Sequence, residues 1–174
     1  MNSDYKELRV GLIGLGLEAY WKQFDGLEAR LLGYLEQVQQ RIAGPSRTIF
    51  NFGLVDTAPK AIVAGHSCRR NDVDILLVYV TTYALSATVL PVILRAKVPV
   101  ILLNLQPAPA IKYEKFNRMT SRTAMTGEWL AHCSSCSVPE IANVLRRLDQ
   151  PFHQVTGMLH DDPECCDQVE QWPR

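Results

Sequence analysis

The sequence has no excess of charge of either sign, because Lys and Arg total 18 and Asp and Glu also total 18 among its 174 residues. A positive field that would attract DNA, RNA or an anionic membrane surface is therefore missing, and we expect no nucleic-acid partner. A long apolar run is also missing. Residues 1–8 are polar and mixed in charge, and the apolar stretch after them is too short for a signal peptide or a membrane span. We expect a cytoplasmic protein without a membrane partner.

Cysteine is scarce and unevenly placed. The five cysteines are an odd number, and four of them fall late in the chain. This distribution is not a disulfide framework, so reduced thiols are expected. Cys133 and Cys136, next to His132, leave three interpretations open: part of a zinc site, a redox pair, or buried free thiols. Cys165 and Cys166 would have to supply the remaining zinc ligands, and adjacent cysteines suit one tetrahedral ion poorly.

Short apolar runs alternate along the chain with segments of helical spacing, and 47% of the residues are hydrophobic. This pattern predicts one α/β domain over residues 1–160, a doubly wound parallel sheet of about five strands, flavodoxin- or Rossmann-like, with helices on both faces. Residues 161–174 are interpreted as a tail or the start of a second domain that is missing. The expected strands are Arg9–Leu15, Thr48–Val55, Asp74–Val80, Val98–Leu103 and Phe152–Met158.

Four helices are expected between these strands. Apolar residues recur at spacings of three and four from Phe24 to Ile42, and further helices are expected over Pro59–Arg70 and Ser86–Ala96. Ser137 and Glu140 have the spacing of a capping box, which predicts a helix start there. Residues 104–126 show no clear periodicity and are predicted to be a long loop, a feature that is often functional.

Ligands of doubly wound sheets bind at the carboxyl ends of the strands. The loops expected at that edge carry Glu18, Trp21 and Tyr83, together with Asn104 and Gln106, and such hydroxyl, amide and aromatic groups suit a polyol. The aromatic residues could equally seal the edge of the core.

Two further hypotheses concern acid–base groups at this edge. His132 could bind a sugar hydroxyl or carry a proton, or its ring could be satisfied by the backbone. Glu18 and Glu128 could form a carboxylate pair, although each could equally be a charge at a helix amino terminus.

The segment from Gly14 to Ala19 matches the dinucleotide fingerprint G-x-G-x-x-A directly after a strand. Bulky residues from Tyr20 onward would crowd the amides that a pyrophosphate needs, and Asp56 lies too far along the chain to be the usual acidic partner. NAD binding is therefore not the favoured interpretation.

An ordered set of motifs resembles the amino-terminal domain of the L-arabinose/L-fucose isomerase superfamily. The resemblance covers most of the chain, from Val10 to about Gly157, and the set is more specific than any one motif. The motifs are VGLIGLGLEAYW (10–21), YVTTY (79–83), NLQP (104–107), MTGEWLAH (125–132) and FHQVTG (152–157).

The resemblance implies a cytoplasmic enzyme that interconverts an aldose and a ketose, with a pentose or deoxyhexose as substrate. It implies Mn²⁺ or another divalent cation in the full-length enzyme, held by later domains and not by this chain, and a homo-oligomer in which a neighbouring subunit closes the pocket. Glu18, Trp21, Tyr83 and His132 match substrate-facing positions, with no catalytic or metal ligand among them. An isolated chain is then expected to be inactive. The alternative is a non-catalytic sugar-binding or assembly module of the same fold.

Overall fold

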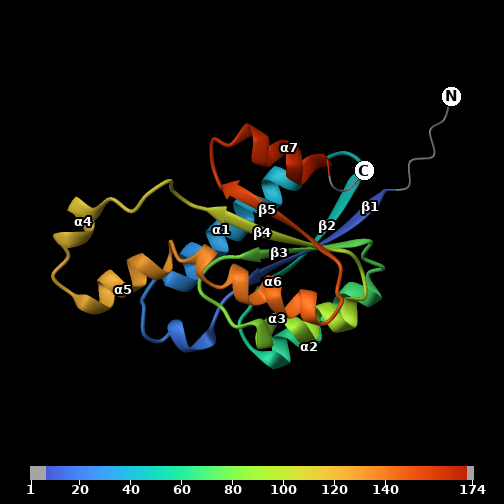
Figure 1. The fold of residues 1–174 in the computed structure, drawn as a ribbon, viewed down its shortest axis with the longest axis horizontal. Helices are drawn as coiled ribbons and strands as arrows, with labels where there is room; N and C mark the ends of the chain where they lie inside the picture. Colours follow the sequence, from blue (N-terminus) through green and yellow to red (C-terminus); the bar gives the residue numbers. More distant parts are fainter. Residues whose placement is uncertain (1–6, 172–174) are drawn as a thin grey trace.

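A computed structural model describes residues 7–171 and shows one parallel β-sheet with helices on both faces (Figure 1). The strand order is β2-β1-β3-β4-β5, and all four neighbouring pairs are parallel. The predicted doubly wound α/β fold is confirmed, with the flavodoxin-like strand order. The strands are β1 (Leu8–Leu15), β2 (Arg47–Val55), β3 (Ile75–Val80), β4 (Val100–Gln106) and β5 (Phe152–Met158).

Two layers of helices cover the sheet. Helices α1 (Leu27–Ile42) and α7 (Pro163–Gln171) lie over one face, whereas α2 (Ala58–Arg70), α3 (Ser86–Ala96) and α6 (Val138–Arg147) lie over the other (Figure 1). Helices α4 (Tyr113–Asn117) and α5 (Arg122–Leu130) project beyond the carboxyl ends of the strands, as Figure 1 shows at the left. Short 3₁₀ turns, η1 (Glu18–Tyr20) and η2 (Ser134–Cys136), lie in the connections after β1 and α5.

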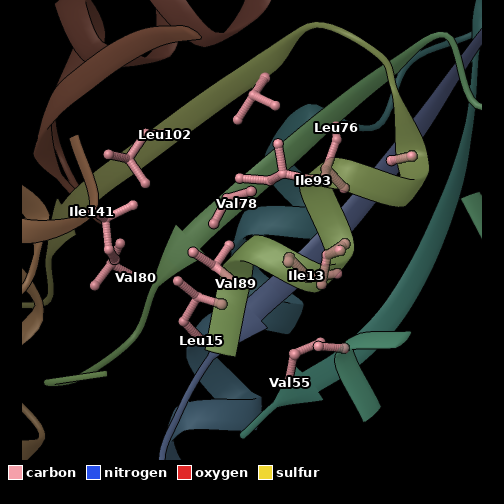
Figure 2. Close-up of a cluster of buried hydrophobic side chains, with 14 of the residues drawn as sticks. Ile13, Leu15, Val55, Leu76, Val78, Val80, Val89, Ile93, Leu102 and Ile141 are labelled. Atoms are coloured by element: carbon pink, nitrogen blue, oxygen red, sulfur yellow. The ribbon is translucent and has the colours of Figure 1, made fainter. Parts of the chain in front are cut away.

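Each face of the sheet has its own hydrophobic core, because successive side chains of a strand point to opposite faces. Leu77 and Tyr79 of β3 join the core under α1, and Leu76, Val78 and Val80 join the core under α2, α3 and α6 (Figure 2). All six residues of β3 are buried, as expected for a central strand covered on both faces.

The predicted helix start at Ser137 is correct, but the capping box is not. Ser137 makes no side-chain cap to its own helix; its Oγ instead accepts a hydrogen bond from the Ala84 amide at 3.3 Å. Glu140 Oε1 accepts from the Ser86 amide at 2.9 Å, at the start of α3. Both side chains therefore tie α6 to the loop after β3, because tertiary partners are within reach.

The predicted loop over residues 104–126 is wrong in part. Strand β4 extends to Gln106, and α4 and the first half of α5 lie within the segment, whereas residues 107–112 and 118–121 are loops as predicted. Ser121 caps α5 by accepting from the Ala124 amide at 3.2 Å. Neither helix shows an apolar stripe in the sequence because both project from the sheet, and only Leu130 of the two is buried.

The segment expected to be a tail is helical over most of its described part. Helix α7 packs against β5 and α1, and the buried Cys165 belongs to the core under α1. Asp162 Oδ1 accepts from the Cys165 amide at 2.9 Å and Oδ2 from the Met158 amide at 2.8 Å. These two hydrogen bonds lower the pKa of Asp162. Residues 172–174 of the predicted tail lie outside the described residues.

Within residues 7–171, no helix combines the length and apolar character needed to cross a membrane.

Candidate functional site

The carboxyl ends of β1 and β3 flank the point where the strand order reverses, which is the usual ligand crevice of such sheets. Here two buried threonines that follow β3 close it. Thr81 Oγ1 donates to the Leu15 carbonyl at 2.5 Å, and Thr82 Oγ1 donates to the Leu130 carbonyl at 2.7 Å. These two hydroxyls are therefore satisfied by the protein itself, and a pocket is found between the α4 segment and α5.

Trp21 holds the loop after β1 in place through a hydrogen bond to Asp56. Its indole Nε1 donates to Asp56 Oδ2 at 2.7 Å, and the same oxygen accepts from Lys60 Nζ at 2.7 Å. The Asp56 side chain is fully buried. Its second oxygen, Oδ1, has no hydrogen-bond partner among the residues described. Lys60 is half exposed and keeps this carboxylate neutralised from the solvent side.

The position of the Trp21 ring also affects the space around the glycine motif at residues 14–19. A Cβ placed on Gly16 would lie 2.7 Å from the Trp21 ring, so the ring occupies the space above the motif where a pyrophosphate would have to lie. No α-helix starts at the motif either, since only the short 3₁₀ turn η1 begins there and α1 begins at Leu27. Asp56 directly follows β2, but Trp21 and Lys60 already bind it. These features do not favour nucleotide binding.

The other aromatic residues at this edge cover the core. The rings of Tyr20 and Phe24 meet edge to face with centroids 5.8 Å apart, and those of Tyr20 and Trp21 at 6.4 Å. Tyr83 is half-buried against the same core. Burial raises the pKa of Tyr20, and Cys133 and Tyr83 raise it further, so these groups are neighbours. This arrangement matches the hypothesis that the aromatic residues seal the edge of the core.

His132 lies in the connection that follows α5. It lines a pocket of about 390 Å³ beneath α4 and α5, which Glu18, Trp21 and Tyr83 do not line. Glu18 is exposed on η1. The structure therefore does not bring the four residues into one pocket. The pocket is lined by Ala108, Ala110, Ile111, Lys112, Lys115, Phe116, Met119, Glu128 and His132.

The His132 ring is held in one orientation. Its Nδ1 lies 2.9 Å from the Glu128 carbonyl oxygen, one helical turn earlier, so Nδ1 carries the proton in the neutral ring. The sequence left open whether the His132 ring hydrogen-bonds to the backbone, and this contact shows that Nδ1 does so. It also leaves Nε2 as the nitrogen that can accept a proton or a hydrogen bond from a ligand. Nδ1 is also 4.0 Å from Glu128 Oε1.

Glu128 connects this pocket with a second one of about 380 Å³, which is bounded by Phe24, Arg30 and Ser121 among others. Arg30 Nη1 donates to Glu128 Oε2 at 2.7 Å, and the second guanidinium nitrogen lies 3.5 Å from Oε1. The hydrogen bond from Arg30 lowers the pKa of Glu128, and the charges of Arg30, His132 and Lys115 lower it further. Glu128 is thus ionised beside His132 and does not pair with Glu18. Local sequence patterns do not reveal the Arg30 contact, because 98 residues separate the partners.

The Arg30–Glu128 pair gives a pH-dependent contribution to stability. Since the folded-state pKa of Glu128 lies below its ordinary value of 4.5, the contribution is present above that value and is lost as pH falls through the lower folded pKa. Both side chains are about one third exposed, so solvent screening limits it to about 0.5 kcal/mol. A double-mutant cycle of Arg30→Gln and Glu128→Gln, measured by urea unfolding at neutral and acid pH, should show coupling only at neutral pH. Coupling that persists in acid would contradict this assignment.

An amide–hydroxyl cluster fixes the turn after α5. Gln106, the last residue of β4, accepts with its amide oxygen from the Ser134 and Ser135 hydroxyls at 2.5 Å, and its nitrogen donates to the His132 carbonyl at 3.2 Å. Ser135 Oγ also lies 3.0 Å from Asn104 Oδ1, so the two amide oxygens share one hydroxyl hydrogen. The side-chain amides of Asn104 and Gln106 were expected to suit a sugar ligand. In the structure they instead position the backbone of His132 and η2.

The cysteines of η2 lie together. Their sulfurs are 2.6 Å apart, Cys133 is buried and Cys136 is exposed. Burial raises the pKa of the Cys133 thiol to about 12. Among the described residues, no three His, Cys, Asp or Glu side chains are grouped so that they could hold a metal ion. The predicted zinc alternative therefore lacks a third ligand in this part of the chain.

Comparison with known proteins adds little to this geometry. No family model matches the sequence. No curated protein matches it either. Among solved structures, a GDSL-like lipase from Bacteroides thetaiotaomicron is similar at 12% identity and a TM-score of 0.40, over 89% of this chain and 72% of that one. At this level of similarity the lipase assigns no family and no activity.

Proposed function

We propose that this chain is the amino-terminal part of a cytoplasmic aldose–ketose isomerase of the arabinose/fucose isomerase kind, and that it contributes the pocket around His132 to the substrate site. The observation that carries the proposal is the fixed His132 ring, with Nδ1 at 2.9 Å from the Glu128 carbonyl and the ring on a pocket large enough for a monosaccharide. The resemblance of the motifs supplies the class of reaction.

Each charged group of the pocket has a part that follows from its contacts. Nε2 of His132 accepts a hydrogen bond from a sugar hydroxyl, or donates one when the ring is protonated. Glu128, held ionised by Arg30, lies beside the ring, with Oε1 4.0 Å from Nδ1. Lys112 and Lys115 supply donors for further hydroxyls at the pocket wall. The described residues do not form a metal site, so the proposal assigns Mn²⁺ or another divalent cation to the remainder of a longer enzyme.

The test is an isomerisation assay with L-arabinose and L-fucose, with and without Mn²⁺. The chain alone and a version extended through the coding sequence that follows Arg174 are measured side by side. Activity only in the extended, Mn²⁺-loaded protein supports the proposal. An extended protein that is folded and metal-loaded but converts neither sugar nor their ketose products counts against it.

A second candidate, a non-catalytic sugar-binding or assembly module, is favoured by one observation. The projecting α4–α5 arm exposes aromatic side chains, with Trp129 45% and Tyr113 65% exposed. Such exposed rings are typical of surfaces that another subunit or a ligand covers. Sugar binding by the isolated chain in calorimetry, together with an inactive extended protein, would favour this candidate. Sedimentation of the same samples would show whether the protein is a homo-oligomer.

A further inference from the structure

The pair of thiols at η2 does not line the pocket of the candidate sugar site. Cys133 and Cys136 are three residues apart at the ends of a single 3₁₀ turn, where side chains at i and i+3 eclipse each other. This geometry places their sulfurs at 2.6 Å. A disulfide requires about 2.05 Å, so the sulfurs need to approach by roughly 0.5 Å.

We propose that Cys133 and Cys136 form a redox-active dithiol, which low-molecular-weight disulfides such as oxidised glutathione convert to an intramolecular disulfide. The inference is independent of the proposed isomerase function, because it rests only on the contacts and exposure of η2.

Exposure decides the order of the two steps. Cys136 is exposed and Cys133 is only 2% exposed, so an incoming disulfide reaches Cys136 first. The Cys136 thiolate attacks one sulfur of the oxidant and expels the other as a thiolate, which takes up a proton. The mixed disulfide on Cys136 is then attacked by the Cys133 sulfur, which loses its proton as the second small thiol leaves. Two protein thiols are oxidised, and one disulfide is reduced to two thiols.

The raised pKa of Cys133 fits its role as the resolving cysteine. A buried thiol with a pKa of about 12 is a poor nucleophile toward oxidants in solution. Its disadvantage is overcome once Cys136 carries the mixed disulfide, because the target sulfur is then held within contact distance. Cys68 differs from this pair, because it is buried in α2, where burial raises its pKa to about 11.

The turn that carries the pair is tied to the candidate site. Ser134 and Ser135, between the two cysteines, are bound by Gln106, which also holds the His132 carbonyl. A disulfide across this turn therefore fixes the backbone next to His132. Through this connection, formation of the disulfide can change the position of His132 in the pocket without chemically modifying any residue that lines the pocket.

The test incubates the full chain in glutathione buffers of increasing oxidised fraction, quenches with acid, and maps the thiols by peptide mass. The wild type should lose two hydrogens, with Cys133 joined to Cys136 and Cys68 still reduced. Cys133→Ser should stop at one glutathione adduct on Cys136, and Cys136→Ser should leave Cys133 unmodified. Cys68→Ser is the matched control and should behave as the wild type.

A second measurement on the unmodified protein covers the case that a variant does not fold. Brief alkylation of native, reduced wild type should label Cys136 well before Cys133. The proposal is overturned if both thiols stay reduced in the most oxidising buffer, if Cys133 is the first to be labelled, or if added Zn²⁺ binds stoichiometrically and protects both thiols.

Discussion

Replacing His132 by alanine in the extended, Mn²⁺-loaded enzyme is expected to lower kcat/KM for its sugar about 10- to 100-fold, the range for loss of a substrate hydrogen bond that contributes about 1–3 kcal/mol. The physical reason is the loss of Nε2 from a ring that Glu128 holds in place through Nδ1. Steady-state isomerisation over a series of sugar concentrations measures the effect. A fall in kcat with unchanged KM would indicate a role in the transition state, whereas a rise in KM alone would indicate sugar binding.

Two conservative variants separate the ring nitrogens. His132→Asn can keep the hydrogen bond to the Glu128 carbonyl but has no group at the position of Nε2, so it should be as impaired as alanine. His132→Gln can place an amide near the position of Nε2 and should retain more sugar affinity. His66→Ala, an exposed histidine on α2, is the control that should be unchanged. Wild-type turnover in both His132→Ala and His132→Asn would contradict the proposed role of His132 in the substrate site.

Gly65→Ala is expected to destabilise the fold by about 1–2 kcal/mol, a net of overpacking that costs about 1–3 kcal/mol and a smaller gain in helix propensity. Gly65 lies where α2 crosses α3. A Cβ there would be 2.7 Å from Arg95 Cβ and 3.0 Å from the Val92 carbonyl oxygen. Backbone atoms cannot rotate away, so the helices must separate. Thermal and urea unfolding measure the loss, which corresponds to a Tm lower by about 2–8 °C for a domain of this size.

Gly33→Ala provides the matched control on another helix. Gly33 lies within α1, and a Cβ added there would meet nothing within 4 Å. The substitution should therefore stabilise the protein by about 0.5–1 kcal/mol, since alanine loses less backbone entropy in a helix. Equal shifts at the two positions would show that the α2–α3 contact is not tight at Gly65.

The strands and most helices could be predicted because their signals are local. Ile75–Val80 is an unbroken apolar run, and β3 is buried on both faces; β5 begins and ends at the predicted residues Phe152 and Met158. Helix α3 likewise has its predicted bounds, with Pro91 tolerated inside it. Helices α4 and α5 could not be predicted in the same way, because a helix that projects from the sheet buries little and needs no apolar stripe.

The site was less accessible to sequence reasoning than the fold. His132 was correctly singled out as a residue near the carboxyl edge, and its pocket is the one beneath α4 and α5. Trp21 lies at the same edge, but its indole is bound to Asp56, 35 residues away. Tyr83 contributes to the cover of the core. Whether an aromatic residue at a strand end faces a ligand or seals the core depends on partners that are distant in sequence.

The sequence by itself determined the parallel α/β architecture, since hydrophobic periodicity and turn residues specify each strand and helix through local interactions. It also placed the polar loops at one edge, because parallel strands bring their carboxyl ends together. Only the tertiary structure decided the pairing of Glu128 with Arg30, the use of Ser137 and Glu140 by the loop after β3, and the contact of the Cys133 and Cys136 sulfurs. These contacts form only when helices and strands pack against one another. A side chain that could hydrogen-bond to its own helix then bonds instead to a residue distant in sequence that packing places nearby.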